Sequence, residues 1–323
     1  MNLFLGLDGG GTRTRALVVD DTGRRIGRGE SGATNPRHAT EAEVGSRLVE
    51  AIGAAFDGVG AGLGDVRAVF VGMAGITSES GRQDMARRVA SCGLGKAQVG
   101  VDHDIRVALA GGLAGEPGIA LIVGTGSSCY GRTGDGRTWQ TGGWEWLIAD
   151  EGSGFWLGRE AIASAARMAD GRQRDTGLRG AVFEWLGIPD ITELMHRLHG
   201  SEMSRAEIAS LAPRVIERAA TGDEAAVRIL ERGADLLAEM VEANHRMLPT
   251  GPGPDVVITG GVGSAATPYR GVLEGAIRRR VAGARIRPAR LSPVAGAVLL
   301  AMRSVDLRVS EDWIRNVAAF EAS

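Results

Sequence analysis

Residues 3–19 read LFLGLDGGGTRTRALVV, and this stretch decides the fold. An apolar run ends in Asp8, three glycines follow, and a second apolar run begins at Ala16. This pattern predicts a strand, a tight turn and a second strand. Because glycine has no Cβ, the backbone of the turn can bend sharply and approach a ligand closely.

The composition of this turn suits a phosphate group. Successive N–H groups, helped by threonine hydroxyls, form a concavity for phosphate oxygens. Asp8 at the strand end can hold Mg²⁺ beside those oxygens, directly or through water. The alternative is an ordinary β-hairpin whose glycines serve only the turn. The dinucleotide G-x-G-x-x-G fingerprint does not fit, because a second strand follows where a helix should begin, and no Gly-Lys-Ser/Thr of a Walker motif occurs here.

Composition narrows the class of protein. The 323 residues are 44% hydrophobic and 24% charged, as in a globular protein of roughly two domains. A net charge of −2 argues against a nucleic-acid binder that relies on a basic surface. Two cysteines, Cys92 and Cys129, are too few for a disulfide framework or a four-thiolate metal site. With no signal-peptide pattern and no apolar run near ~18 residues, we expect a cytoplasmic protein.

The strand–turn–strand pattern recurs further along the chain. Ile119–Val123 is apolar, 124–128 (GTGSS) is a glycine and hydroxyl turn, and Cys129–Arg132 resumes a strand. The repeat lies about 115 residues after the first and rests on order and turn chemistry, not identity. It predicts two copies of a mixed α/β unit facing each other across a cleft. We expect domains at 1–116 and 117–323, with a helical insertion at about 155–250 and a last helix that packs back on the first domain.

The remaining periodicity predicts further strands and helices. Thr40 and Glu43 form a capping-box pattern, and Ser292-Pro293 is typical of a helix start. Strands are expected at 25–31, 66–71, 98–101, 138–141, 255–259 and 284–287, and helices at 41–56, 79–91, 105–113, 155–170, 224–247 and 293–302.

Three glycine turns follow apolar strands, at 8–12, 124–127 and 260–263, with Asp104 at a strand end between the first two. Together they resemble the superfamily of sugar kinases, heat-shock cognate proteins and actin. The closer likeness is to the N-acetylglucosamine kinase and BadF/BadG/BcrA/BcrD ATPase family. It spans almost the whole chain: LDGGGTRTRALV, VDHD, IVGTGSSC, GGWEWLIADEGSGFWLG, VVITGGV and SPVAGAVLLA. The resemblance implies an α/β fold of two ribonuclease H-like, actin-like ATPase domains, each with a mixed five-stranded sheet flanked by helices, and an active-site cleft between them.

The resemblance also implies catalytic roles, with ATP and Mg²⁺ as cofactors. Asp104 matches the general base, and a carboxylate suits removal of a proton from a sugar hydroxyl. The alternatives are that Asp104 only caps the following helix, or that Asp102 is the base. Asp8 would hold Mg²⁺ through water. The residues implied to contact the nucleotide are Asp8, Gly10, Gly11, Thr12, Thr14, Thr125, Gly126, Gly260 and Gly261.

A second implied set contacts an amino sugar: Asn35, Gly75, Asp104, Ser128, Gly143, Trp144 and Asp150. Trp144 could form an apolar wall, with core packing as the alternative. We expect Trp146 and Trp156 to be core residues. Ser128 replaces the asparagine of the mammalian-type G-T-G-S-N-C turn, which leaves recognition of the N-acetyl group open.

The resulting hypothesis is an ATP-dependent kinase that phosphorylates the C6 hydroxyl of N-acetylglucosamine. Glucosamine and N-acetylmuramic acid stay as alternative substrates. The resemblance further implies a homodimer, while the net charge and the absence of a long apolar run lead us to expect no nucleic-acid or membrane partner. Two alternatives from other classes remain: an ATPase activator with an iron–sulfur cluster, which would need thiolates at an interface, and a non-catalytic sugar sensor. The five histidines show no metal-hydrolase motif.

Overall fold

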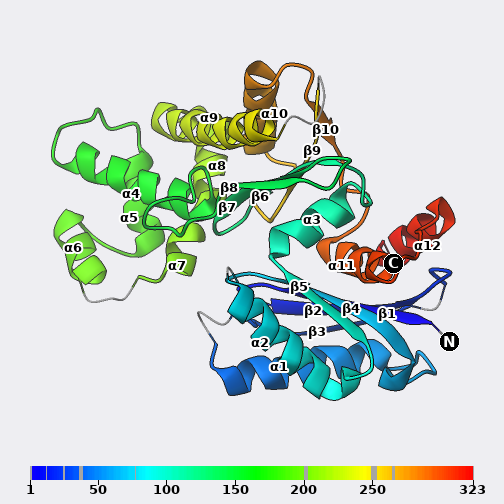
Figure 1. Ribbon diagram of the computed structural model, residues 1–323. Coiled ribbons are helices and arrows are strands. Elements are labelled where there is room, and N and C mark those ends of the chain that lie inside the picture. Colours follow the sequence, from blue (N-terminus) through cyan, green and yellow to red (C-terminus); the bar gives the residue numbers. More distant parts are fainter. Residues whose placement is uncertain are drawn as a thin grey trace. The chain divides into compact units, whose positions relative to one another are not determined.

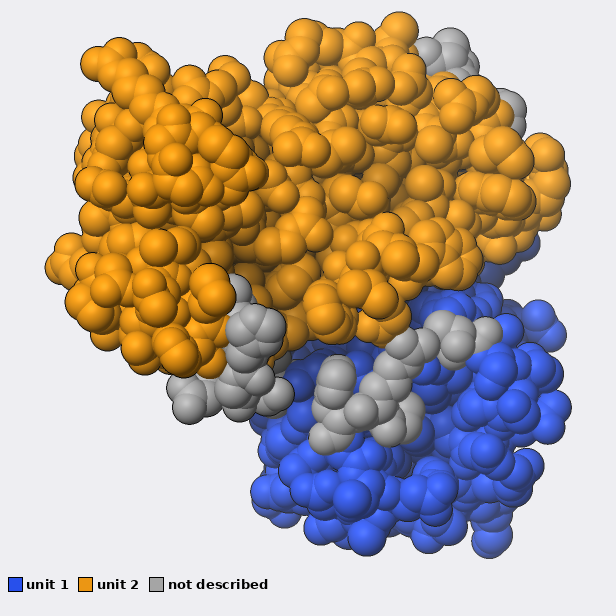
Figure 2. Space-filling view, turned by 90° about the vertical axis from the view of Figure 1, so that its left-hand side faces the viewer, with its two compact units in different colours: residues 1–118, 287–323 blue, residues 119–286 orange. Residues whose placement is uncertain are grey.

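The computed structural model describes residues 2–11, 13–24, 26–35, 39–76, 78–199, 203–248, 253–263 and 266–322, with only the backbone at 198 and 199. The chain forms two compact units (Figure 2). The first unit combines residues 1–118 with 287–323, and the second comprises 119–286. The first unit is therefore built from both ends of the chain.

The first unit contains a five-stranded sheet in the order β3-β2-β1-β4-β5. Its strands are β1 (Leu3–Gly9), β2 (Arg13–Asp20), β3 (Ile26–Gly32), β4 (Val66–Met73) and β5 (Gln98–Asp102). β1, β2 and β3 pair antiparallel, whereas β4 lies parallel to both β1 and β5. The carboxyl ends of β1, β4 and β5 consequently meet at one edge of the sheet.

Helices cover both faces of this sheet (Figure 1). They are α1 (Glu41–Phe56), α2 (Glu79–Val89), α3 (Asp104–Gly112), α11 (Pro293–Ser304) and α12 (Glu311–Glu321), with a 3₁₀ turn η1 (Leu63–Asp65) and a π turn η2 (Ala90–Leu94). Along β1, Leu3, Leu5 and Leu7 pack with α1 and α2, and Phe4 packs with α11 and α12. This alternation is what a strand buried on both faces requires.

The last helices are fastened closely to the first sheet. A Cβ at Gly6 would overlap the carbonyl oxygen of Val294, so the backbone of α11 lies directly on β1. Trp313 of α12 is fully buried, and its Nε1 donates to the carbonyl of Asp20 at 3.1 Å. Residues 287–321 thus complete one face of a sheet formed by the first 102 residues.

The second unit repeats this topology. Its sheet has the order β10-β9-β6-β7-β8. Read from the other end, β8, β7, β6, β9 and β10 take the places of β3, β2, β1, β4 and β5 in the first sheet. The strands are β6 (Gly118–Val123), β7 (Ser127–Arg132), β8 (Thr138–Gly142), β9 (Asp255–Thr259) and β10 (Arg285–Arg287). β6 and β9 are parallel, and β7 and β8 antiparallel. The expected repeat, and the fold class of two mixed five-stranded sheets flanked by helices, are confirmed.

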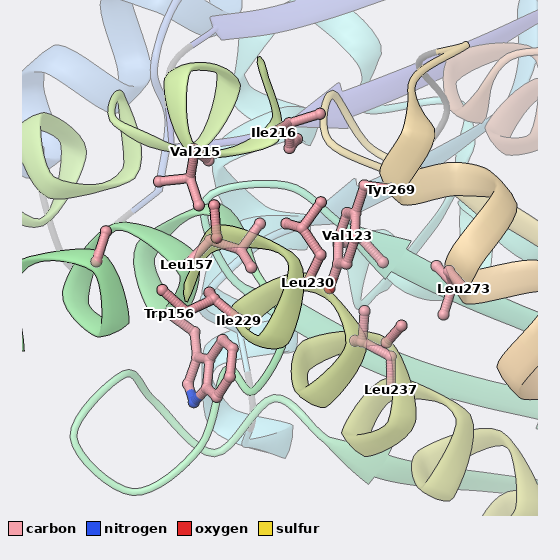
Figure 3. Close-up of a cluster of buried hydrophobic side chains, with 14 of the residues drawn as sticks. Val123, Trp156, Leu157, Val215, Ile216, Ile229, Leu230, Leu237, Tyr269 and Leu273 are labelled. Carbon is pink, nitrogen blue, oxygen red and sulfur yellow. The ribbon is translucent and has the colours of Figure 1, made fainter. Parts of the chain in front are cut away.

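Helices of the second unit share one core with its sheet (Figure 3). They are α4 (Gly154–Ala169), α5 (Leu178–Leu186), α6 (Ile191–His199), α7 (Arg205–Ala209), α8 (Ala212–Ala220), α9 (Glu224–Met247) and α10 (Pro268–Arg280). α9 has the bounds expected from sequence, and Asp223 caps it by accepting from the N–H groups of Ala225 and Ala226. Trp156 of α4, Leu230 and Leu237 of α9, and Tyr269 of α10 converge in this core.

Two local expectations were wrong. Trp146 is 43% exposed and meets Phe155 edge to face at 5.4 Å, so it is not a core residue. β7 begins at Ser127, two residues before the expected start at Cys129, because Ser128 already pairs with Gly142 of β8. Trp156 is buried, as expected. Over the described residues, no helix is both long and apolar enough to cross a bilayer.

Candidate active site

The carboxyl edge of the first sheet brings acidic residues together. Asp8 on β1 pairs with Gly72 on β4, and Gly72 pairs with Asp102 on β5. Asp104 follows two residues later as the first residue of α3. Three parallel strands therefore end side by side, with carboxyl groups at both outer positions of the row.

Asp8 has an unusual protonation equilibrium. Burial and the neighbouring charge of Asp104 raise its pKa to about 6, although Arg15 and Arg13 oppose the shift. A buried carboxylate beside a second carboxylate creates a demand for positive charge. A divalent cation held by one carboxylate, waters and substrate phosphates would meet this demand.

Asp104 is the carboxyl group best prepared to accept a proton. Burial raises its pKa, while its own N–H, the N–H of Ile105 and the charge of His103 favour the ionised form. A base whose pKa is raised toward the operating pH removes protons more effectively. Its N-cap neighbour His103 makes no side-chain capping bond, so the carboxyl of Asp104 itself meets the first N–H groups of α3.

Asp102, the competing carboxylate, is occupied by other contacts. One oxygen accepts from the N–H of His103 at 2.9 Å, and the other accepts from Nη1 of Arg106 at 2.5 Å. Arg82 lies 3.7 Å from the first oxygen. Both oxygens of Asp102 are therefore engaged by neighbouring groups, which favours Asp104 as the base.

The first glycine turn is closed by a bond from the N–H of Gly10 to the carbonyl of Arg13 at 3.0 Å. At Gly11 no atom lies within 4 Å of the place of a Cβ, so the turn presents open backbone. Thr12 lies outside the described residues. Thr14 is fully buried, and its hydroxyl donates to the carbonyl of Gly32 at 2.8 Å and contacts the hydroxyl of Thr34. Thr14 therefore supports the turn from behind, which differs from the direct phosphate contact expected of it.

Asn35 and Gly75 lie against each other at the same edge. Gly75 has φ +84°, and a Cβ there would overlap Oδ1 of Asn35. The N–H of Ala74 donates to the carbonyl of Gly9 at 2.9 Å, which ties this segment to the first glycine turn. The structure thus brings two expected sugar contacts together next to the turn that follows β1.

The second glycine turn, residues 124–126, is anchored by the first residues of α4. The N–H of Gly154 donates to the carbonyl of Gly124 at 2.8 Å, and the N–H of Phe155 donates to that of Thr125 at 3.1 Å. In a trans peptide the C=O and the following N–H point in opposite directions. The N–H groups of Thr125 and Gly126 therefore point away from α4, and neither has an acceptor among the described residues. Two outward amides suit an anion.

Ser128, Gly143 and Trp144 lie together beside this turn. A Cβ at Gly143, where φ is +77°, would lie 2.8 Å from the hydroxyl of Ser128. Trp144 follows at once and is 61% exposed. Its exposure excludes core packing and fits a wall for a ligand.

Asp150 lies behind the second turn with 3% of the residue exposed. Its Oδ1 accepts from the N–H of Ser127 at 3.0 Å, and Oδ2 accepts from Nη2 of Arg205. Burial raises the pKa of this carboxyl, and the bonds to Ser127 and Arg205 oppose the shift. A carboxylate has about four acceptor positions, so these two bonds leave capacity for a sugar hydroxyl.

The third turn continues from β9 and is fixed to the end of β6. Gly260 has φ +89°, and a Cβ there would lie 2.5 Å from the carbonyl oxygen of Val123. The same oxygen accepts from the N–H groups of Val262 and Gly263. Gly261 has no atom within 4 Å of its Cβ position. The third turn therefore lies beside Gly124, with open backbone at Gly261.

A family model for the BadF/BadG/BcrA/BcrD ATPases matches residues 5–301. The chain belongs to this family. An N-acetylmuramic acid/N-acetylglucosamine kinase of Clostridium acetobutylicum is 33% identical over 75% of this chain and 79% of its own length. An N-acetyl-D-glucosamine kinase of Dictyostelium discoideum is 27% identical over 94% of this chain and 98% of its own. A solved structure from Chromobacterium violaceum, provisionally assigned as an N-acetylglucosamine kinase, has a TM-score of 0.75 and 29% identity and covers 93% and 98% of the two chains.

The geometry also identifies residues that sequence reasoning missed in this member of the ATPase family. Thr34 is buried between Thr14 and Gly9. Arg205 bonds Asp150 from within the helical insertion. Thr34 adjoins a recognised motif, but nothing in the sequence around Arg205 links it to a glycine turn.

The two cysteines take no visible part in these sites. Cys129 on β7 is fully buried, and burial raises the pKa of its thiol. Cys92 is half-buried, with its thiol donating to the carbonyl of Arg88. Within the described ranges no group of three or more His, Cys, Asp or Glu gathers to hold a metal ion.

Proposed function

We propose that the protein is an ATP-dependent amino-sugar kinase that phosphorylates the C6 hydroxyl of N-acetylglucosamine. The observation that supports it most is the coexistence of a buried, raised-pKa carboxyl at Asp104 with the outward amides of Thr125 and Gly126. One feature supplies a base for an alcohol and the other supplies donors for phosphate oxygens. The named activities of the relatives support the same reaction class.

In this proposal Asp104 accepts the proton of the sugar hydroxyl at a carboxylate oxygen as that hydroxyl attacks the γ-phosphate of ATP. Asn35, Gly75, Ser128, Gly143, Trp144 and Asp150 bind the sugar and present its hydroxyl. Gly10, Gly11 and Thr12 of the first turn, supported by Thr14, and Thr125 and Gly126 of the second contact phosphate oxygens, while Gly260 and Gly261 border the adenosine. Phosphoryl transfer asks the protein mainly for such positioning.

The residues present fit Mg²⁺ through Asp8. Burial and the charge of Asp104 raise the pKa of Asp8 against the opposing charges of Arg15 and Arg13, so a cation bound here would favour the ionised carboxylate. One carboxylate with waters and phosphate oxygens is the usual magnesium arrangement in phosphotransferases, so no cage of protein ligands is needed. When bound, Mg²⁺ neutralises negative charge on the phosphate oxygens. Asp8, near the end of β1, would hold the cation in position, directly or through water.

Ser128 leaves the choice of amino sugar as part of the proposal. The relative from Clostridium acetobutylicum is named for two acetylated sugars. A shorter side chain at this position leaves more room beside Gly143, which keeps N-acetylmuramic acid and glucosamine as alternative acceptors. We also propose a cytoplasmic homodimer, on the supply of ATP and on family likeness.

ADP release measured across N-acetylglucosamine, glucosamine, N-acetylmuramic acid, N-acetylmannosamine and glucose tests the proposal. We expect the highest kcat/KM with N-acetylglucosamine and a product phosphorylated at C6, identified by NMR. ADP release that is the same with and without every sugar would contradict it. An iron-loaded, coloured preparation would instead favour the ATPase-activator alternative.

A further inference from the structure

Arg205 connects the helical insertion to the second glycine turn. It is the first residue of α7, a short helix capped by a reciprocal pair of bonds between Ser204 and Glu207. A Cβ at Gly158 would overlap the carbonyl oxygen of Ile208, so α7 lies directly on the backbone of α4. The same α4 anchors the glycine turn through its first N–H groups. Arg205 therefore lies on a helix that packs against α4, the helix that anchors the second glycine turn.

The guanidinium of Arg205 acts on the turn through Asp150. Nη2 donates to Oδ2 of Asp150, and Oδ1 of the same carboxylate accepts from the N–H of Ser127 at 3.0 Å. Asp150 has φ +65°, a conformation that L-residues rarely adopt, and its side chain is 5% exposed. A strained and buried carboxylate persists only where its surroundings fix it. The ion pair with Arg205 is one such constraint.

Both charged groups lie directly against Gly126. A Cβ at Gly126 would lie 2.5 Å from Nη2 of Arg205 and 2.7 Å from Oδ1 of Asp150. Gly126 is the residue whose N–H points away from α4 without an acceptor among the described residues. Displacement of the guanidinium or the carboxylate would therefore move the peptide groups that we propose to bind phosphate.

We propose that Arg205 is a positioning residue for phosphoryl transfer, which holds Asp150 on the N–H of Ser127 and thereby keeps the amides of Thr125 and Gly126 directed at the substrate phosphates. The inference rests on the proposed function, because it concerns the phosphate contacts of that site. It assigns a role in catalysis to a residue outside the glycine turns and the loop that precedes α4.

A second arginine–aspartate pair provides a matched control. Nη2 of Arg218 donates to Oδ2 of Asp223 at 2.9 Å, and the two side chains are 36% and 2% exposed, against 30% and 5% for Arg205 and Asp150. In both arginines Nε is buried without an acceptor among the described residues. Asp223, however, caps α9 and contacts no glycine turn. Loss of Arg218 tests the stability cost of such a pair without disturbing the phosphate contacts.

The experiment compares R205M, R205K and R218M in the full-length protein. We measure Tm, ADP affinity by isothermal titration, and KM for ATP and kcat at saturating sugar. We expect R205M and R218M to lower Tm to a similar extent, because each leaves a buried carboxylate without its partner. Only R205M should weaken ADP binding and raise KM for ATP, each by at least about tenfold. R205K should recover part of the loss, since it keeps the charge but not the planar fork.

A double variant tests the route through Asp150. If Arg205 acts through this carboxylate, D150N/R205M binds ADP no more weakly than the worse single variant. Additive losses would overturn the route, and wild-type ADP affinity and KM in R205M, with a Tm loss equal to that of R218M, would overturn the role. If R205M does not fold, R205K against R218K decides by the same measurements. Failure of the wild type to phosphorylate any sugar would contradict the proposed function alone, because ADP titration still compares the variants.

Discussion

The two glycine turns occupy equivalent places in sheets of the same topology, yet their surroundings differ in charge. The turn after β1 lies next to two buried carboxyl groups, Asp8 and Asp104, and the charge of Asp104 adds to burial in raising the pKa of Asp8. The turn after β6 lies over Asp150, whose charge is met by Arg205 and Ser127, and it presents two outward N–H groups. In our proposal both turns contact phosphate, but only the first has carboxyl groups beside it for proton and cation chemistry. Duplicated topology fixes where a site forms but not what it does.

The largest expected effect tests the acidic turn. Asp104→Asn removes the proposed base while keeping its size, so kcat should fall at least ~100-fold with little change in KM for the sugar. Asp102→Asn is the control, because Asp102 pairs with Arg106 and Arg82. Its loss should lower Tm and leave kcat within a few-fold of the wild type. Steady-state kinetics with near-normal turnover in Asp104→Asn would remove the distinction between the two turns.

Asp8 tests the same turn through pH. Its pKa in the folded chain, about 6, lies above the ordinary aspartate value of 3.8, so ionised Asp8 costs stability above pH 6, and its protonated form restores stability as the pH falls toward 4. Asp8→Asn should therefore raise Tm by a few degrees at pH 8, with the advantage vanishing at pH 4.

The Mg²⁺-dependent activity of Asp8→Asn should fall more than tenfold at pH 8, because an amide neither carries charge nor orients the cation. Calorimetry at both pH values and a magnesium titration of ADP release check the pair of effects. A variant less stable than the wild type at pH 8 would show that Asp8 is stabilised by its surroundings, contrary to this electrostatic account.

Gly75→Ala sharpens the comparison at the proposed sugar contact of the first unit. The added methyl overlaps Oδ1 of Asn35, and the alanine backbone must adopt φ +84°. Because both effects displace Asn35, KM for the sugar should rise about tenfold. Gly58→Ala is the matched control, since its φ is +75° and no atom lies within 4 Å. It should lose similar stability and keep its KM. Equal KM values in the two variants would separate Asn35 from substrate binding.

The smallest effect concerns the wall beside the amide-rich turn. Trp144 is 61% exposed, so Trp144→Ala should leave Tm nearly unchanged and raise KM for the sugar by no more than about fivefold. Trp156 is only 3% exposed, so Trp156→Ala should lower the free energy of unfolding by about 3–5 kcal/mol. Thermal melts and sugar titrations distinguish these roles.

Much of the fold follows from local sequence. The capping box at Thr40 and Glu43, and the cap at Ser292, mark helix starts that the structure reproduces. The strand–turn–strand repeat predicts both sheets because turn chemistry and apolar alternation are local properties. Trp146 was misjudged because residue type alone does not say whether a loop folds inward; the loop here bends through positive φ at Gly143 and Glu145.

Interactions between distant segments were beyond this reasoning. Thr14 was expected at phosphate from its place in the turn, but burial against Gly32 and Thr34 is decided by the neighbouring strand. Arg205 lies 55 residues from Asp150 in the chain, and no periodicity or motif relates the two positions. Such contacts depend on how helices pack, which a single sequence does not specify.

The return of α11 and α12 to the first sheet has a consequence for biosynthesis. The second unit is one continuous stretch, whereas the first needs residues 287–321 to cover Phe4, Leu17 and Phe70. During synthesis, one hydrophobic face of the N-terminal sheet therefore stays exposed to solvent while residues 119–286 are translated and fold. A nascent chain that stops before residue 287 would expose this apolar face and would be expected to bind chaperones. A premature stop codon at that point would therefore destabilise the unit that was translated first.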